Sequence, residues 1–146
     1  MLLLQSSDDI KFSIKNFKVV SKLKPTRKVL NNLIFAFNIC RFVKSNAIVL
    51  THRGTTVGIG SGQPSRLDSC KIAIDKLKKF NSDINGEILA ASDAFFPFVD
   101  GIETLVQSGV TAVIQPSGSV RDKEIIKYAN ETGTILVFSK SRHFNH

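Results

Sequence analysis

Three short stretches of the sequence combine side chains that can bind ligands with residues that favour tight turns. In the first, GIGSGQPSR, the glycines Gly58, Gly60 and Gly62 allow close backbone approach, and Arg66 follows them. Free N–H groups at a helix start form a good anion site when a guanidinium lies beside them. The spacing fits neither the dinucleotide-binding glycine fingerprint nor the phosphate-binding P-loop. The stretch is therefore either a ligand loop or an ordinary tight turn.

The second stretch, ASDAFFPFVDG, sets three aromatic rings between two carboxylates, Asp93 and Asp100. One interpretation places Phe95, Phe96 and Phe98 in the core, with either carboxylate capping the next helix. The other makes the rings a stiff apolar wall for a flat heteroaromatic ligand, whose donors the carboxylates would orient. The residue types alone leave both interpretations open.

The third stretch, QPSGSVRD, is another turn of small residues that exposes backbone N–H groups. The chain then closes with SRHFNH, which brings Arg142, His143 and His146 together. Terminal tails usually fray unless contacts hold them. If this tail is ordered, an active site is one candidate for what holds it.

Hydrophobic periodicity predicts strands and helices that alternate along the chain. The expected strands lie in residues 11–20, in two segments on either side of the Arg53-Gly54 turn, and in residues 87–92, 111–118 and 134–139. The expected helices span about residues 26–43, a segment from the Ser65 cap to the end of its apolar stripe at Leu77, residues 100–108, and a segment from the Ser119–Asp122 cap to Gly133. Asp68, three residues after Ser65, would complete a capping box.

This alternation predicts an α/β layered sandwich with a mostly parallel sheet, apart from the early hairpin. We expect one domain over residues 11–146, preceded by a loose lead-in over residues 1–10. Ligands of open α/β sheets bind beyond the carboxyl ends of the strands. The three turn-rich stretches should therefore converge at that end of the sheet.

Composition narrows the class of protein. The net charge of +8 and the isoelectric point of 9.7 allow nucleic-acid binding. The lysines are spread along the chain, however, and no known nucleic-acid motif is present, so we do not favour that function. No apolar run approaches the roughly 18 residues of a membrane span, and the start lacks a signal-peptide pattern, so we expect a cytoplasmic protein with no membrane partner.

The two cysteines, Cys40 and Cys70, each stand alone in an apolar helical pattern. Neither belongs to a cluster with the spacing of a zinc site. We therefore expect both to be reduced core residues.

Read together, VKSNAIVL, GIGSGQPSR, ASDAFFPFVDG, VIQPSGSVRD and RHFNH resemble the carboxyl-terminal part of a family of bifunctional purine enzymes. These enzymes combine aminoimidazole carboxamide ribonucleotide transformylase with IMP cyclohydrolase. The resemblance runs from NFKVVSKLKPT to the last residue, about 130 positions. It implies a fold similar to cytidine deaminase, without zinc, because the H-x-E and P-C-x-x-C signatures are absent.

The resemblance also implies an activity and a set of contacts. The activity is that of a phosphoribosylaminoimidazolecarboxamide formyltransferase, which moves a formyl group from 10-formyltetrahydrofolate to the ribonucleotide. Asn46, Phe95 and Arg142 match positions that contact the ribonucleotide, with Arg142 as the phosphate partner. The positions matching the folate site are Arg66, Leu67, Asp100, Ser119 and Val120. A monovalent cation, K⁺, near Asp93 is a further feature of relatives.

The sequence also departs from this family. The catalytic Lys-His dipeptide occurs nowhere in the chain, the cyclohydrolase domain is lacking, and the match covers the last quarter to third of the usual polypeptide. We therefore expect no catalytic residue in this chain, and no activity without the missing upstream segment. The resemblance implies a homodimer, or complementation by that missing part.

Two alternatives stay open. The chain could be a nonenzymatic remnant that binds nucleotide or folate weakly. Arg27 and Lys28 at the expected start of the first helix fit a remnant, since positive charge there opposes the helix dipole by about 0.3–1 kcal/mol per residue. A basic nucleic-acid-binding module is the other, less favoured alternative.

Overall fold

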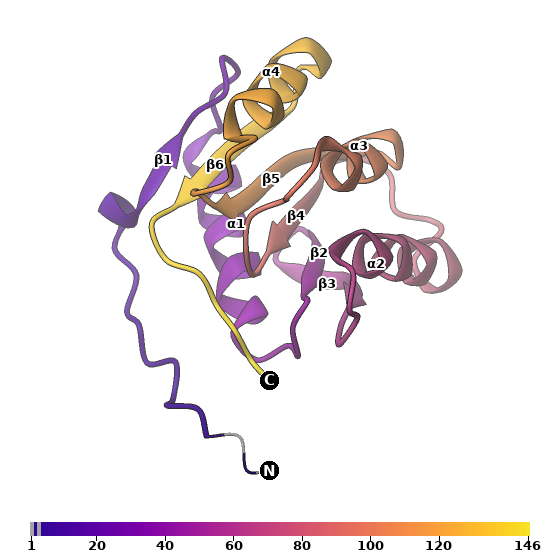
Figure 1. Cartoon of the computed structure of the whole chain (residues 1–146). Coiled ribbons are helices and arrows are strands. Elements are labelled where there is room, and N and C mark those ends of the chain that lie inside the picture. Colours follow the sequence, from indigo (N-terminus) through magenta and orange to yellow (C-terminus); the bar gives the residue numbers. More distant parts are fainter. Residues whose placement is uncertain (1, 3) are drawn as a thin grey trace.

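Six strands form a single sheet with the order β1-β6-β5-β4-β2-β3 (Figure 1). This computed structural model describes residue 2 and residues 4–146 of the chain. The strands are β1 (Phe17–Val19), β2 (Ile48–His52), β3 (Thr55–Gly60), β4 (Ile88–Ser92), β5 (Val110–Pro116) and β6 (Ile135–Ser139). A short 3-10 helix, Ile14–Asn16, precedes β1.

The three central strands, β4, β5 and β6, are parallel to one another. β2 runs antiparallel to both β3 and β4, and β1 runs antiparallel to β6. β3, β4, β5 and β6 therefore share one direction. These pairings confirm the α/β sandwich with a mostly parallel sheet. The antiparallel edge strand β1 was not expected, because its partner lies at the far end of the sequence and no local pattern indicates its direction.

The hairpin between β2 and β3 turns at Arg53 and Gly54, as predicted. Both residues have positive φ, +48° and +73° respectively. A two-residue turn with positive φ at both positions matches the twist of the strands that it joins.

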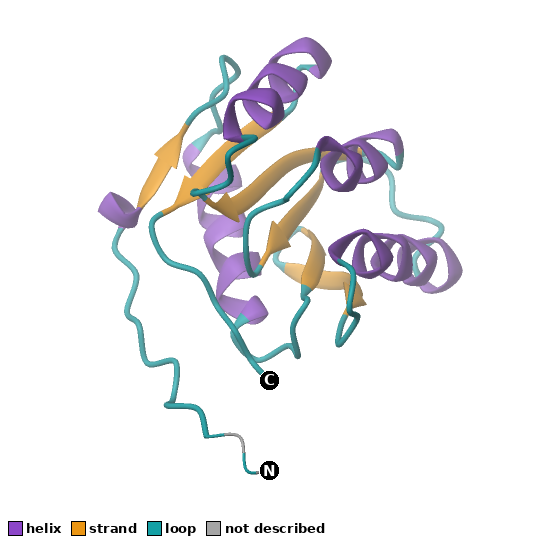
Figure 2. Ribbon diagram, viewed as in Figure 1, coloured by secondary structure: helices purple, strands orange, loops and turns teal. Residues whose placement is uncertain are grey.

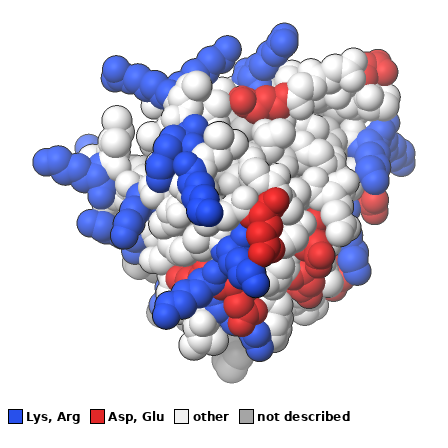
Figure 3. Space-filling model, turned by 90° about the horizontal axis from the view of Figure 1, so that it is seen from above, with Lys and Arg blue, Asp and Glu red and all other residues white. Residues whose placement is uncertain are grey.

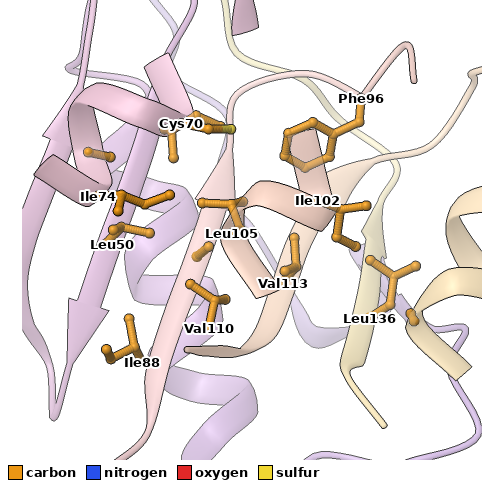
Figure 4. Close-up of a cluster of buried hydrophobic side chains, with 14 of the residues drawn as sticks. Leu50, Cys70, Ile74, Ile88, Phe96, Ile102, Leu105, Val110, Val113 and Leu136 are labelled. Carbon is orange, nitrogen blue, oxygen red and sulfur yellow. The ribbon is translucent and has the colours of Figure 1, made fainter. Parts of the chain in front are cut away.

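Helices cover both faces of the sheet (Figure 2). Helix α1 (Arg27–Cys40) packs on one face, whereas α2 (Arg66–Phe80), α3 (Val99–Gln107) and α4 (Asp122–Thr132) pack on the other. The strands separate two buried clusters, because successive side chains point to opposite faces. In β4, Ile88 and Ala90 join the cluster under α2, α3 and α4 (Figure 4), and Leu89 and Ala91 join the cluster under α1.

The start of α1 follows the prediction, and its end does not. The Thr26 hydroxyl accepts a hydrogen bond from the Val29 N–H at 3.2 Å, which caps the helix. The helix ends at Cys40, three residues earlier than expected. Beyond it the N–H groups of Phe42 and Val43 donate to carbonyls three residues back, so the chain leaves the helix in tighter turns.

The capping hydrogen bonds predicted for α2 and α4 are not formed. Ser65 is the N-cap residue of α2, but its side chain accepts no capping hydrogen bond. Helix α4 begins at Asp122 after Arg121, rather than at a Ser119 cap. The Asp122 carboxylate instead accepts hydrogen bonds from the N–H groups of Gly118 and Ser119, at 2.9 and 3.2 Å. It therefore stabilises the turn before the helix.

Cys40 and Cys70 are free and buried, as predicted. Burial raises the pKa of Cys70 to about 12, so this thiol stays protonated at neutral pH. None of the helices in the described residues is long and apolar enough to cross a membrane.

Candidate functional site

A cavity of about 470 Å³ lies where β3, β4 and β6 end. Its walls come from the loop before β2, the start of α2, the loop from β4 into α3, and the tail after β6. Six of the eight ligand-contacting residues implied by the resemblance line it: Asn46, Arg66, Leu67, Phe95, Asp100 and Arg142. The expected convergence of the turn-rich stretches is therefore observed for the first two stretches and the tail.

The aromatic loop between β4 and α3 places one ring in the core and two rings at the cavity. The ring of Phe96 is buried, and a side chain at Gly101 would lie only 2.5 Å from it. Phe96 is therefore a core residue whose edge reaches the cavity. Phe95 is half-buried, Phe98 is 54% exposed, and both line the cavity. These two rings form an apolar wall that a flat ligand could stack against.

Neither carboxylate of this loop caps α3, because Phe98 occupies the N-cap position. Asp100 lies in the first turn of α3, and one of its oxygens accepts a hydrogen bond from the Gly101 N–H at 2.7 Å. Its side chain is exposed at the cavity. Asp100 can therefore accept further hydrogen bonds from a ligand, as the resemblance implies.

The glycines of the first stretch serve packing. A Cβ at Gly58 would lie 2.2 Å from the Ala73 carbonyl oxygen, and one at Gly60 would lie 1.8 Å from that of Ser69. Only glycine lets α2 pack this closely on β3. The prediction that Gly58 and Gly60 allow close backbone approach is right for the neighbouring helix α2. The part of the stretch that lines the cavity is residues 64–66.

Arg66 is buried, and its guanidinium is already paired. Its Nη1 donates hydrogen bonds to a carboxylate oxygen of Asp93 and, at 3.0 Å, to the Ser92 hydroxyl. Its Nη2 donates to Asn46 Oδ1 at 2.8 Å. We call these side chains, with Ser45, the arginine–aspartate cluster. A carboxylate as deeply buried as Asp93 requires such a partner, since an unpaired buried charge is costly.

This pairing changes what Arg66 can do. The residue types suggested a guanidinium free to meet an anion, but Asp93 neutralises it. Arg66 instead orients Asn46, whose amide also donates to the carbonyls of Gln63 and Pro64 at 2.9 and 3.1 Å. Asn46, joined to Ser45 by a cis peptide bond, is therefore held at the cavity wall from three directions.

The tail, residues 140–146, is ordered by contacts with the protein itself. The N–H of His143 donates to the Asp93 carbonyl at 2.9 Å. Ser45 and Asn145 are joined twice, through the Ser45 N–H to the Asn145 carbonyl and the Asn145 N–H to the Ser45 hydroxyl. In Figure 1 the tail runs back from β6 past the end of the sheet. Arg142 and Phe144 project from it into the cavity wall.

Arg142 differs from Arg66 in its electrostatic state. It is exposed, and its guanidinium carbon lies 5.3 Å from the centroid of the Phe144 ring. Within the part of the chain that the structure describes, Arg142 forms no ion pair. It is therefore a cation at the cavity whose charge is not neutralised, as a phosphate partner must be.

Ser119 and Val120 lie beside the cavity and do not line it. Val120 is 99% exposed and lies in the turn that hydrogen bonds to the Asp122 carboxylate stabilise. The same turn brings the Arg121 guanidinium over the Phe98 ring, at 5.2 Å from its centroid. Sequence reasoning missed Arg121 and Phe144, although the alternation of side chains along an extended tail could have indicated Phe144.

Both oxygens of the Asp93 carboxylate already have partners, so a K⁺ ion near Asp93 would need other oxygen ligands. One carboxylate oxygen pairs with Arg66, and the other accepts a hydrogen bond from the Ser45 hydroxyl at 2.7 Å. The Arg66 guanidinium also repels a second cation at the same carboxylate. No cluster of three His, Cys, Asp or Glu side chains that could bind a metal ion occurs among residues 2 and 4–146.

Comparison with known proteins decides the family. The model of the AICARFT/IMPCHase bienzyme family matches residues 1–76. This chain belongs to that family. Within it, the bifunctional purine biosynthesis protein PurH of Aquifex aeolicus is 46% identical to the chain over 144 residues, which are 99% of the chain and 28% of that relative.

Two further bifunctional purine biosynthesis proteins are as similar. PurH of Neisseria meningitidis and PurH of Buchnera aphidicola are each 47% identical over 145 residues, and the match covers 27% and 28% of their lengths. The chain therefore spans little more than a quarter of the AICARFT/IMPCHase relatives that it matches. The family resemblance carried by the five motifs is confirmed.

Proposed function

We propose that this chain forms one wall of a transformylase site in purine biosynthesis. The site would bind aminoimidazole carboxamide ribonucleotide and 10-formyltetrahydrofolate as a phosphoribosylaminoimidazolecarboxamide formyltransferase does. The observation that carries this proposal is the cavity, which gathers six of the eight implied contact residues. One of them, Arg142, forms no ion pair within the described part of the chain.

Three side chains with different roles would form the part of the site that binds the ribonucleotide. Arg142 supplies the charge for a phosphate, since a guanidinium can donate two parallel hydrogen bonds to it. Phe95 offers a ring face to the flat imidazole. Asn46 is held in one orientation by Arg66. Because both Nδ2 hydrogens of Asn46 bond to backbone carbonyls, its Oδ1 keeps one lone pair for a ligand donor.

The folate half lies toward α2 and α3. Asp100 can accept hydrogen bonds from the amino and ring N–H donors of a pterin. Leu67 adds apolar surface, and the start of α2, which its N-cap side chain leaves uncapped, can favour the negatively charged tail of a folate. Ser119 and Val120 would contact this ligand only at the rim.

The reaction needs a proton transfer that this chain does not supply. The exocyclic amine attacks the formyl carbon, the bond from that carbon to folate N10 breaks, and the amine proton moves to N10. General acid–base catalysis of such a step contributes about 10²–10⁴-fold. No histidine or lysine lines the described cavity, and the sequence has no Lys-His dipeptide. We propose that the acid and base come from the rest of the enzyme or from a partner copy.

Charge distribution does not favour the nucleic-acid alternative. Lys and Arg side chains project around the face shown in Figure 3, and acidic side chains are interspersed among them. A phosphate backbone is bound most strongly by a continuous basic surface.

A complementation assay tests the proposed function. The chain is mixed with both substrates, alone and together with the separately produced remainder of a bacterial relative, and formylated product is measured. We expect product only in the mixture. If the chain binds a substrate but neither the chain alone nor the mixture forms product, the alternative of a nonenzymatic remnant is supported. If the chain binds neither substrate, the proposed site is contradicted. A steeply salt-dependent affinity for DNA or RNA would instead favour the nucleic-acid module.

A further inference from the structure

One residue of the tail points away from the cavity and is almost completely buried. The side chains of the extended tail alternate, so that Arg142 and Phe144 face the cavity while His143, between them, faces the interior. The exposed fraction of His143 is 1%. Whatever holds His143 therefore also fixes the direction of its two neighbours.

Aromatic packing holds the imidazole ring. Its centroid lies 4.6 Å from that of Phe37 on α1 and 5.3 Å from that of Phe12 in the segment before β1. Contacts between aromatic rings at such distances contribute beyond their buried area. These contacts bring together three parts of the chain: the tail, α1 and the segment before β1.

A single polar contact completes the environment of the ring. Nδ1 of His143 pairs with a carboxylate oxygen of Asp8, in the segment expected to be a loose lead-in. That segment contains no helix or strand over residues 4–13, yet Arg41 donates hydrogen bonds to the carbonyls of Asp8 and Ile10 at 3.2 and 2.7 Å. Asp8 is therefore held in place to accept from the imidazole.

We propose that His143 is a positioning residue, which pairs with Asp8 to hold Arg142 and Phe144 in the wall of the ligand cavity. The proposal rests on the proposed function only for its effect on ligand binding. The tail geometry itself can be tested without any ligand.

The pair should also respond to pH. The Asp8 carboxylate accepts a hydrogen bond from the Nδ1–H of neutral His143, and Nε2 is buried without a partner among the described residues. Protonation would add a buried N–H with no acceptor. Burial lowers the pKa of His143, although the hydrogen bond and charge of Asp8 oppose this shift. The other charges that act on the ring are Arg41, which lowers the pKa, and Asp93, which raises it.

The sign of the pH effect follows from this lowered pKa. We call the tail docked when residues 140–146 make the contacts described above. Because His143 binds a proton less well in the docked tail than in the released tail, docking is favoured above the ordinary histidine pKa, near 6.5. Docking should weaken as the pH falls through that value, because protonation favours the released tail.

The test measures the ordering of the tail and the affinity for the ribonucleotide separately in His143→Ala. The matched control is His52→Ala, because His52 lies at the end of β2 that is far from Ser45 and the tail. Hydrogen exchange followed by NMR reports on the His143 and Asn145 N–H groups, which bond to Asp93 and Ser45. Exchange of the Asn145 N–H should be at least about tenfold faster in His143→Ala, while Val113 in β5 stays protected. Calorimetry should show binding of the ribonucleotide weakened by about tenfold, since only the docked fraction of tails is competent.

The controls separate the two proposals. His143→Leu keeps the apolar packing but has no side chain that titrates. The exchange rate of the Asn145 N–H in this variant, divided by the rate in the wild type at the same pH, should therefore change between pH 7 and pH 5. If tail exchange in His143→Ala equals that of the wild type, or if the pH ratio is constant, the positioning role is wrong. If the tail loosens but ribonucleotide affinity does not change, the role in the cavity is likewise wrong. If the wild type does not bind the ribonucleotide at all, the proposed function fails, and tail exchange alone decides whether the His143–Asp8 pair holds the tail.

Discussion

The two arginines at the cavity occupy opposite electrostatic states. Arg66 is buried and neutralised by Asp93 inside the arginine–aspartate cluster. Arg142 is exposed on the tail, and no carboxylate of the described residues pairs with it. A buried, paired charge mainly orients its neighbours, and an exposed, unpaired one is available to a ligand. In the proposed function, the Arg66 side of the cavity would supply rigidity and the Arg142 side would supply the charge for binding.

Removing the carboxylate from the cluster should have the largest effect. Asp93→Ala leaves the Arg66 guanidinium buried without a counter-charge, and breaking a buried pair in this way costs about 3–5 kcal/mol. We expect that loss in the free energy of unfolding measured in urea. Asp68→Ala, which removes an exposed carboxylate paired with Lys71 at 4.0 Å in the first turn of α2, should lower it by only about 0.3–1 kcal/mol. Equal stabilities for the two variants would show that the cluster is not a structural unit.

The amide that joins the cluster to the cavity should show a mixed effect. Asn46→Ala removes hydrogen bonds to Gln63, Pro64 and Arg66, so the free energy of unfolding should fall by about 1–3 kcal/mol. Ribonucleotide affinity, measured by calorimetry, should fall as well, since the contact surface is lost. A variant that loses stability but binds normally would place Asn46 in the cluster alone.

Much of this arrangement follows from local sequence patterns. The alternation of strands and helices predicts the layered fold, and the carboxyl ends of parallel strands bring Arg66, Phe95 and Arg142 to the same edge. The apolar stretch after β4 correctly indicates an aromatic wall, although only packing against Gly101 separates the buried Phe96 from the exposed Phe98.

The remaining features depend on contacts between distant segments. Nothing near Arg66 in the sequence indicates that its partner is Asp93, 27 residues away, so its charge state could not be predicted. The direction of β1 could not be predicted either, because its partner β6 lies near the other end of the sequence. The pairing of Asp8 with His143 joins opposite ends of the sequence and could not be predicted for the same reason. Local periodicity predicts elements, and it cannot identify partners that only the folded chain brings together.

The rim of the cavity should give the smallest effect. Arg121 lies over the Phe98 ring and also pairs with Glu124 at 2.9 Å. An exposed cation–π contact contributes about 0.5–1 kcal/mol, so Arg121→Ala should weaken folate binding by only about two- to fivefold in fluorescence titrations. Lys127→Ala, in the exposed pair on the next turns of α4, is the control. A tenfold or larger loss in Arg121→Ala would mean that the rim contributes charge as Arg142 does.

The most direct test of the account measures stability and ribonucleotide affinity together for Arg142→Ala, with Arg27→Ala at the exposed start of α1 as the control. We predict an unfolding free energy within about 1 kcal/mol of the wild type, because only an exposed contact with the Phe144 ring is lost. The dissociation constant should rise at least about tenfold, because hydrogen bonds to a charged phosphate are lost. An unchanged dissociation constant, or a loss of stability as large as that of Asp93→Ala, would contradict the division of roles between the two arginines.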